Sequence, residues 1–336
     1  MTIQTHNSII SLSVIEKIKS SERSEQMKAL ITGVAGFVGR YLADCLNSNG
    51  WEVYATKLKS EKTAIADTKM YDLDILFQAE IEKILESVKP DCIFHLVAQS
   101  SVKLSWEKPQ LTADINIKGA INLLEAVRKK LPQTKVILIG SGEEYGRIES
   151  VPVDENTKPQ PQNIYAVTKA CQNMIGTLYS KAYNMNIVMV RAFNHIGKGQ
   201  APFFVVSDFC KQVADIEKGI KEPVIYVGNL SAKRDFADVK DVVRAYELIA
   251  RYGKTGETYN VGSGKAIAID EILKKIISMS EKNIEIKIDE NRLRPIDVPI
   301  IEADISKLKN DTGWVAEIPI ERTIGETLDY WRNYKG

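Results

Sequence analysis

The chain of 336 residues is long enough for one large domain or two modest domains, and its 44% hydrophobic and 26% charged residues are typical of a globular protein. A formal net charge of +1 gives no electrostatic reason to expect nucleic acid or a membrane surface as a partner. No uninterrupted apolar run approaches the roughly 18–20 residues of a membrane span. Four scattered cysteines and three scattered histidines argue against a disulfide framework or a metal site, and the cysteines favour a reducing, cytoplasmic location.

Residues 1–26 precede the first strong motif. Their apolar patch comes first and charged residues follow at 17–23, which is the reverse of the order in a secretory signal. We therefore expect an N-terminal extension, formed by a short amphipathic helix or a frayed segment, with docking of a partner as the alternative.

A glycine-rich turn lies between two predicted strands. Residues 28–32 form a short apolar run, a helical pattern extends to residue 46, and residues 52–56 form the next strand. Glycines permit a tight turn, and the start of a helix offers N–H groups and a positive dipole end to a pyrophosphate. The turn therefore predicts a dinucleotide-binding unit. Its predicted cofactor-binding residues are Gly33, Gly36, Phe37, Val38 and Gly39.

The glycine spacing is Gly-x-x-Gly-x-x-Gly, and Tyr-x-x-x-Lys follows downstream at 165–169. Together the two motifs resemble the extended subclass of the short-chain dehydrogenase/reductase superfamily. The resemblance implies an oxidoreductase that uses a nicotinamide cofactor. It also implies an α/β fold, in which a Rossmann-type doubly wound parallel sheet carries a smaller α/β C-terminal substrate domain.

Lys57 follows the second predicted strand, where a NAD-binding unit often has an acidic residue for the ribose 2′-hydroxyl. No acid stands at the end of this strand, and lysines suit a 2′-phosphate. We therefore predict NADP as the cofactor, with NAD as the alternative if these lysines are only solvated loop residues.

The resemblance places further cofactor contacts after the next two strands. The segment 70–75 resembles a strand end that touches adenine, and it indicates Asp74 and Ile75 as the contacts. The segment 91–100 matches a His-x-x-Ala-x-Ser element that lies along the cofactor's phosphates and nicotinamide ribose, with Leu96 and Ala98 as contacts. His95 within this element is expected to be a core histidine without chemistry.

The stretch from Ser141 to Lys169 carries the predicted chemistry. An apolar run at 136–140 delivers Ser141, and Tyr165 and Lys169 lie four positions apart on one face of a predicted helix. An ammonium beside a phenol lowers the pKa of the phenol, so that Tyr165 can exchange a proton with a carbonyl or hydroxyl oxygen. Ser141 could hydrogen-bond the same oxygen. By the resemblance, Tyr165 and Lys169 also contact the cofactor, with Lys169 at the nicotinamide ribose. Surface helices carry this spacing by chance, and the glycine turn upstream favours the catalytic interpretation.

Four rounds of strand and helix, ending with a strand at 186–191, predict a parallel sheet covered on both faces. We assign residues 27–191 to a NAD(P)-binding Rossmann domain. Residues 192–336 are assigned mainly to a second domain, and a return of later segments to the first domain stays open. The remaining predicted elements are a long helix at 109–130 that contains Asn116, helices at 203–219 and 239–252, and strands at 224–227 and 258–261.

The segments 234–241, 260–264 and 292–299 resemble the branch of this superfamily that modifies nucleoside diphosphate sugars, which implies that residues 192–336 are mainly a sugar-nucleotide-binding domain. Because the guanidinium fork bonds two oxygens at once, Arg234 and Arg294 are candidate pyrophosphate ligands. The alternative for these arginines is a structural ion pair, such as Arg234 with Asp238. By resemblance, the other candidate substrate-binding residues are Ser101, Glu143, Asn194 and Lys211.

Motifs at 141–146 and 191–197 most resemble the members of that branch that act on GDP-mannose derivatives. Reductases and dehydratases of this kind both transfer hydride at sugar C4, but a dehydratase also needs an acid and a base to eliminate the C6 hydroxyl. Dehydratases have Thr, then Asp or Ser, then Glu, where this chain has Ser141, Gly142 and Glu143. Gly142 has no side chain that could protonate a leaving hydroxyl. We therefore predict NAD(P)H-dependent reduction of the C4 keto group of a GDP-4-keto-6-deoxy-hexose, to a product of the GDP-rhamnose type.

Glu143 is the fourth predicted catalytic residue, and it keeps other functions open. It would serve a GDP-mannose 4,6-dehydratase as a base, or it would hold a sugar hydroxyl. A C4 epimerase of nucleotide sugars is a further enzyme alternative, and a sugar-nucleotide-sensing protein is the non-enzyme alternative. The resemblance also implies a homodimer that packs two long helices, matching 109–130 and 161–183, into a four-helix bundle.

Overall fold

The computed structural model describes residues 26–148, 150–293, 296 and 298–335. The predicted N-terminal extension lies outside these residues except for Gln26. Among the described residues, no helix combines the length and the apolar character that crossing a bilayer requires.

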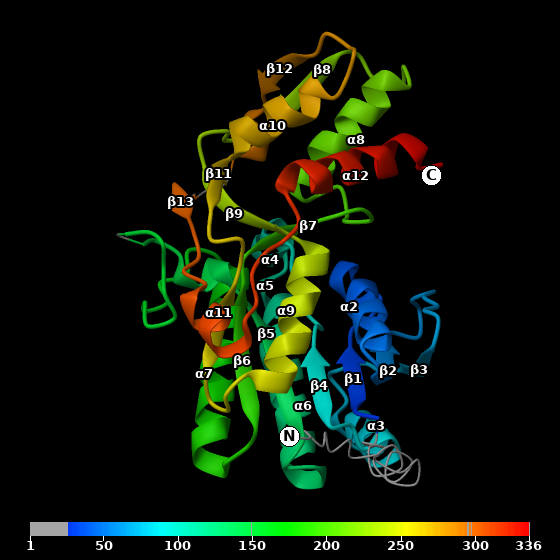
Figure 1. The fold of residues 1–336 in the computed structure, drawn as a ribbon, viewed down its shortest axis with the longest axis vertical. Coiled ribbons are helices and arrows are strands. Elements are labelled where there is room, and N and C mark those ends of the chain that lie inside the picture. The colour runs from blue at the N-terminus through cyan, green and yellow to red at the C-terminus, as the bar shows by residue number, and fades with distance from the viewer. Residues whose placement is uncertain (1–25, 149, 294–295, 297, 336) are drawn as a thin grey trace, which may run out of the picture.

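A seven-stranded sheet forms the larger part of the molecule (Figure 1), and its strand order is β10-β6-β5-β4-β1-β2-β3. Every neighbouring pair in this sheet is parallel. The order reverses direction at β1, which confirms the predicted doubly wound sheet. The strands are β1 (Lys28–Thr32), β2 (Glu52–Lys57), β3 (Thr68–Asp72), β4 (Cys92–His95), β5 (Lys135–Ser141), β6 (Ile187–Ala192) and β10 (Thr258–Val261).

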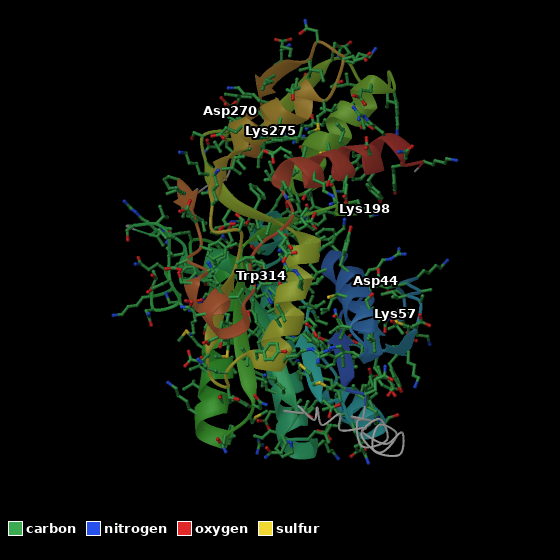
Figure 2. All side chains as sticks on the ribbon, in the orientation of Figure 1. Asp44, Lys57, Lys198, Asp270, Lys275 and Trp314 are labelled. Atoms are coloured by element: carbon green, nitrogen blue, oxygen red, sulfur yellow. The ribbon has the colours of Figure 1, made fainter. Side chains whose placement is uncertain are left out.

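Helices cover both faces of this sheet. Successive strand residues point to opposite sides, so each face carries apolar side chains that a layer of helices buries. In β5, Ile137 belongs to one buried core and Leu138 to the other. The first face carries α2 (Phe37–Ser48), α9 (Val239–Tyr252) and α11 (Ser306–Thr312), with the buried Trp314 beside α9 (Figure 2). The second face carries α3 (Gln78–Val88), α4 (Val102–Glu107), α5 (Pro109–Ala113), α6 (Gly119–Lys130) and α7 (Ile164–Tyr183).

The long helix predicted at 109–130 is interrupted by a π-helical turn, η1 (Asp114–Lys118), between α5 and α6. Asn116 lies fully buried in this turn. Its side chain accepts a hydrogen bond from Gln99 N at 2.8 Å and donates to Thr168 Oγ1 on α7 at 2.9 Å. Single π turns inside α-helices are frequent at functional sites, and this one joins the loop after β4 to the helix that carries Tyr165.

The smaller part of the molecule is built from the C-terminal half of the chain and has its own core. A four-stranded sheet has the order β11-β9-β13, with β7 also paired to β9, and β8 and β12 form a parallel pair. In contrast, α9 and β10 leave this part and complete the larger sheet. The strands are β7 (Asn194–Ile196), β8 (Val224–Val227), β9 (Lys233–Asp238), β11 (Ala266–Ala268), β12 (Glu285–Ile288) and β13 (Ile300–Ile301). The helices are α8 (Val205–Glu217), α10 (Ile269–Ser278), α12 (Ile320–Asn333) and the short η3 (Glu290–Arg292).

Candidate active site

The carboxyl ends of four neighbouring strands meet at one edge of the large sheet. In the strand register, Thr32 of β1 is opposite His95 of β4, and Ser141 of β5 is opposite Ala192 of β6. The loops that follow these strands therefore gather at one edge. Ligands of open α/β sheets bind at such an edge.

The glycine turn after β1 has the geometry of a phosphate cradle. Gly33 has a φ of +79°, and its N–H and that of Val34 donate to Thr56 O at 3.0 and 2.9 Å. Gly36 caps α2 without a side-chain hydrogen bond, and no acidic residue stands in the first turn of this helix. A β-carbon at Gly39 would lie 2.2 Å from Val34 O. The residues present therefore fit a pyrophosphate on the start of α2, and Phe37 and Val38 form its first turn.

Lys57 lies at the end of β2, beside β3 (Figure 2), and its ammonium contacts Asp72 Oδ1 at 2.7 Å. The lysine side chain is 16% exposed, whereas that of Asp72 is 52% exposed. This pair places a carboxylate next to the position predicted for the 2′-phosphate. The sequence did not suggest it, because the cross-strand partner of Lys57 depends on the register between β2 and β3.

Replacing Asp72 with asparagine is expected to lower the KM for NADPH about threefold and to leave the KM for NADH unchanged. The substitution removes a negative charge that competes with the 2′-phosphate for Lys57 and would repel it. Steady-state kinetics with both cofactors measure the ratio. Asp44→Asn, which removes an exposed carboxylate on α2 (Figure 2), is the control and should leave the ratio unaltered. An unchanged ratio in Asp72→Asn would argue against Lys57 as the phosphate ligand.

The other predicted cofactor residues lie in the loops that follow β3 and β4. Asp74 Oδ1 accepts a hydrogen bond from Leu76 N at 3.0 Å, and Ile75 is buried against Gly119 of α6. Leu96 N donates to Thr32 O at 3.1 Å, which brings the loop containing Ala98 alongside the glycine turn. Ser101, predicted to bind substrate, is the N-cap of α4, and its hydroxyl accepts from Leu104 N at 3.2 Å.

Ser141, Tyr165 and Lys169 come together where β5 ends against α7. Ser141 caps the 3-10 turn η2 (Gly142–Tyr145), where its hydroxyl accepts the N–H of Glu143 at 3.2 Å, and it lies close enough to the Tyr165 side chain to lower the pKa of that phenol. The N–H of Tyr165 in turn donates to the buried hydroxyl of Ser105 on α4 at 3.2 Å. Lys169 is 3% exposed and donates to Ile139 O at 2.7 Å and to Gln172 Oε1 at 2.9 Å.

The charge state of this group differs from the sequence prediction. Burial raises the pKa of Tyr165, Glu143 and Glu144 raise it further, and only the hydrogen bond with Ser141 lowers it. The expected lowering of the tyrosine pKa by Lys169 was wrong for the protein chain alone, because this ammonium is held by Ile139 O and Gln172. Burial lowers the pKa of Lys169 itself to about 8, and Glu144 opposes that change. Tyr165 is therefore a protonated phenol at neutral pH, which is the form that can donate a proton.

Glu143 faces the start of α7. Asn163 Nδ2 donates to Glu143 Oε2 at 3.1 Å, and the same asparagine caps the helix by accepting from Ala166 N at 2.8 Å. At the neighbouring Gly142, a β-carbon would lie 3.0 to 3.2 Å from ring atoms of Phe193. A side chain at position 142 would therefore need the Phe193 ring to shift.

The predicted substrate residues lie at several places in the smaller part of the molecule. Asn194 opens β7 directly after Phe193, and Arg234 is a buried residue of β9 whose Nη1 donates to Lys233 O at 2.8 Å. Lys211 on α8 pairs with Asp215 at 2.6 Å and lies 5.7 Å from the centre of the Trp331 ring. Arg294 lies outside the described residues. Asp238, the alternative ion-pair partner for Arg234, caps α9 and accepts from Thr323 Oγ1 at 2.7 Å.

Three residues of the site had no predicted role. Asn163 orients Glu143, and Ser105 receives the N–H of Tyr165. Gln172 receives the ammonium of Lys169. The sequence predicts that residues 159–163 cap the helix that carries Tyr165, and Asn163 is this cap, but its contact with Glu143 was not predicted. No sequence signal identifies the other two residues, because their contacts depend on how α4, α7 and β5 pack. Among the described residues, no cluster of three or more His, Cys, Asp or Glu side chains could hold a metal ion.

Comparison with known proteins gives a consistent set of relatives. A family model described as GDP-mannose 4,6 dehydratase matches residues 30–327. The GDP-6-deoxy-D-mannose reductase of Pseudomonas aeruginosa is 29% identical over 308 residues, which cover 91% of this chain and 97% of the relative. The structure of RMD from Pseudomonas aeruginosa complexed with NADPH has a TM-score of 0.80 and 27% identity, covering 91% of this chain and 99% of that one. A UDP-glucose 4-epimerase from Thermus thermophilus, in complex with NAD, has a TM-score of 0.82 and 28% identity over 91% of this chain and 99% of that one.

Proposed function

Because this chain belongs to the GDP-mannose 4,6 dehydratase family, we propose that it reduces the C4 keto group of a GDP-4-keto-6-deoxy-hexose to give a product of the GDP-rhamnose type. The family and the fold confirm the superfamily that the sequence predicted. The observation that carries the proposal is the pair of Gly142 and Phe193. Position 142 offers no acid to a leaving hydroxyl, and the Phe193 ring packs against the place where a side chain would begin.

The chain's own residues fit a nicotinamide dinucleotide, with NADP preferred and NAD as the alternative. The turn from Gly33 to Gly39 would hold the pyrophosphate, and Lys57 would meet the 2′-phosphate. When bound, NADPH supplies the hydride that becomes the hydrogen on sugar C4. The residues proposed along the adenosine and nicotinamide halves are Asp74, Ile75, Leu96 and Ala98.

Tyr165 is the proposed proton donor. Its hydroxyl gives a proton to the C4 oxygen as the carbonyl becomes a hydroxyl, and Ser141 holds that oxygen by a hydrogen bond. Lys169, four residues along α7, is proposed to bind the nicotinamide ribose. Its ammonium would act on the phenolate that Tyr165 leaves behind only when it gives up the contacts with Ile139 O and Gln172 that hold it in the protein chain alone. Ser101, Asn194, Lys211, Arg234 and Arg294 are proposed to hold the sugar nucleotide.

A GDP-mannose 4,6-dehydratase is the second candidate, and Glu143 is the observation that favours it. This carboxylate lies beside Tyr165, raises its pKa, and is oriented by Asn163. In a reductase, the same carboxylate would hold a sugar hydroxyl instead of removing a C5 proton.

The deciding experiment mixes the protein with GDP-4-keto-6-deoxy-mannose and NADPH and follows the loss of NADPH absorbance. Stoichiometric oxidation of NADPH with formation of a 6-deoxy sugar nucleotide supports the reductase. Conversion of GDP-mannose without added cofactor would favour the dehydratase, and isomerisation at C4 without net redox change would favour an epimerase. Binding of the sugar nucleotide without any turnover would indicate a sensing protein.

A homodimer is proposed from the exposed apolar stripe on α7. Val167, Met174 and Leu178 are 47%, 63% and 63% exposed, and Leu111 on the neighbouring α5 is 41% exposed. Their spacing places them on one side of the helix, as packing against a second copy would require. Light scattering is expected to give twice the mass of one chain. The measurement uses a reducing buffer, because we propose a cytoplasmic location. The mass of one chain would contradict the dimer.

A further inference from the structure

A buried carboxylate lies directly behind the proposed catalytic serine. Glu144 is fully buried in η2, and its Oε1 accepts the backbone N–H of Ser141 at 2.8 Å. It reaches back to the residue that starts its own turn, in the manner of a capping box. The backbone position of Ser141 therefore depends on this carboxylate.

The pocket around the Glu144 carboxylate is built from other elements of the large sheet. Asn173 on α7 donates to both of its oxygens at 2.9 and 3.0 Å, and Arg191 of β6 approaches Oε2 at 3.3 Å. A β-carbon at Gly140 would lie 2.2 Å from Glu144 Oε1 and 2.3 Å from Asn173 Nδ2. The glycine at position 140 is therefore required by the space that the carboxylate and its amide partner occupy.

Arg191 extends this arrangement away from the active site. Its Nη1 donates to Tyr145 Oη at 2.9 Å, and this hydroxyl donates to Asn260 Oδ1 on β10 at 2.7 Å. Glu144 thus connects Ser141, the helix that carries Tyr165 and Lys169, and the two strands at this edge of the sheet.

The charge of Glu144 acts on Lys169. Glu144 of η2 is the charge that acts on this ammonium, and Arg191 of β6 is paired with Glu144 itself. The ammonium in turn lowers the pKa of the buried His95 of β4, which is neutral. Burial lowers the pKa of Lys169, and Glu144 is the charge that raises it. Burial raises the pKa of Glu144 above its ordinary value, and Arg191, Ser141 N–H and Asn173, which all donate to its carboxylate, oppose this rise.

We propose that Glu144 is a positioning residue of the reductase, which holds Ser141 against Tyr165 and keeps Lys169 in its ammonium form. The proposal rests on the proposed function, because an ammonium is needed where carbonyl reduction leaves a phenolate on Tyr165. Glu144 touches neither substrate nor cofactor. It acts through the backbone of Ser141 and through the field at Lys169.

The test of catalysis is the pH profile of Glu144→Gln, which keeps the shape of the side chain and removes its charge. Lys169 then loses its proton at lower pH, so we expect about a tenfold loss of kcat near pH 8.5 and no more than about a threefold loss near pH 6.5. Glu155→Gln is the matched control, since Glu155 accepts from Asn260 N at 2.8 Å in the same network but is not among the charges that act on Lys169. An equal loss at every pH would show a merely structural role and overturn the proposal.

A second variant covers the case in which Glu144→Gln does not fold because Arg191 is left unpaired. The double substitution Glu144→Gln with Arg191→Gln removes both buried charges, which proteins often tolerate better than half of a pair. The basic limb of its profile should move in the same direction. A limb that stays in place in this variant would overturn the proposal as well.

A double-mutant cycle with Lys169→Met measures the same link without catalysis. The pKa of Lys169 is lowered to about 8 in the folded protein. Burying this ammonium therefore lowers the free energy of unfolding fully below about pH 8, and the loss declines as the pH rises toward the ordinary lysine pKa. The substitutions Glu144→Gln and Lys169→Met should be coupled in unfolding experiments at about pH 7 and independent at about pH 9.5. If the two substitutions are coupled but the protein reduces no sugar nucleotide, the proposed reaction is refuted and the link between Glu144 and Lys169 is not. Reductase activity with no coupling would refute the role of Glu144.

Discussion

Replacing Tyr165 with phenylalanine is expected to lower kcat for carbonyl reduction about 10³-fold, with the KM for the sugar nucleotide changed less than about threefold. The ring stays in its place at the start of α7, so binding is kept, but no group remains to give the C4 oxygen a proton. Steady-state kinetics with purified protein measure the two constants.

Tyr179→Phe is the matched control for this experiment. Tyr179 is on the same helix and its hydroxyl donates to Glu125 Oε1 at 2.9 Å, away from Ser141. Removing that hydroxyl should leave kcat unaltered. If Tyr165→Phe retained the kcat of the parent protein, Tyr165 would not be the proton donor.

The substitution Gly39→Ala is expected to abolish NADPH binding and to lower the free energy of unfolding by about 3 kcal/mol. Its β-carbon would lie 2.2 Å from Val34 O and 2.5 Å from Val34 Cα, and backbone atoms in a tight turn cannot move away as a flexible side chain can. Relief requires α2 to move off β1, which widens the turn meant for the pyrophosphate. Denaturant unfolding and fluorescence titration with NADPH measure the two effects.

Gly325→Ala tests whether the loss at position 39 comes from crowding or only from adding a side chain to a helix. Gly325 lies inside α12, where a β-carbon meets nothing within 4 Å. This control should be neutral or should stabilise the protein by up to about 1 kcal/mol, because alanine is the better helix former. Equal destabilisation at both positions would contradict the close packing of α2 on β1.

Much of the fold followed from local patterns. The strands β8 and β10 begin and end at the predicted residues, and Tyr165 and Lys169 share a helix capped by Asn163. Apolar runs of four to seven residues and helical periodicity are local signals, so they can be recognised without knowledge of the partners.

The charges in the site could not be predicted in the same way. The spacing of Tyr165 and Lys169 suggested that the ammonium acts on the phenol, but the carbonyl of Ile139 on β5 receives this ammonium. Asp72 pairs with Lys57 because β3 lies beside β2 in a particular register. Such pairings depend on which strands and helices become neighbours, and no local pattern contains that information.

The return of α9 and β10 to the large sheet affects how the protein can be divided. A chain cut after β6 would leave that strand at an open edge and would remove Tyr246 and Tyr259, which are fully buried in the core of the large sheet. The piece after the cut would carry the same two aromatic side chains without a sheet to cover them. The cofactor-binding and substrate-binding halves are therefore not exchangeable modules. A chimaera with another family member must exchange residues 239–261 and 306–314 together with the first half, or it will join two incomplete cores.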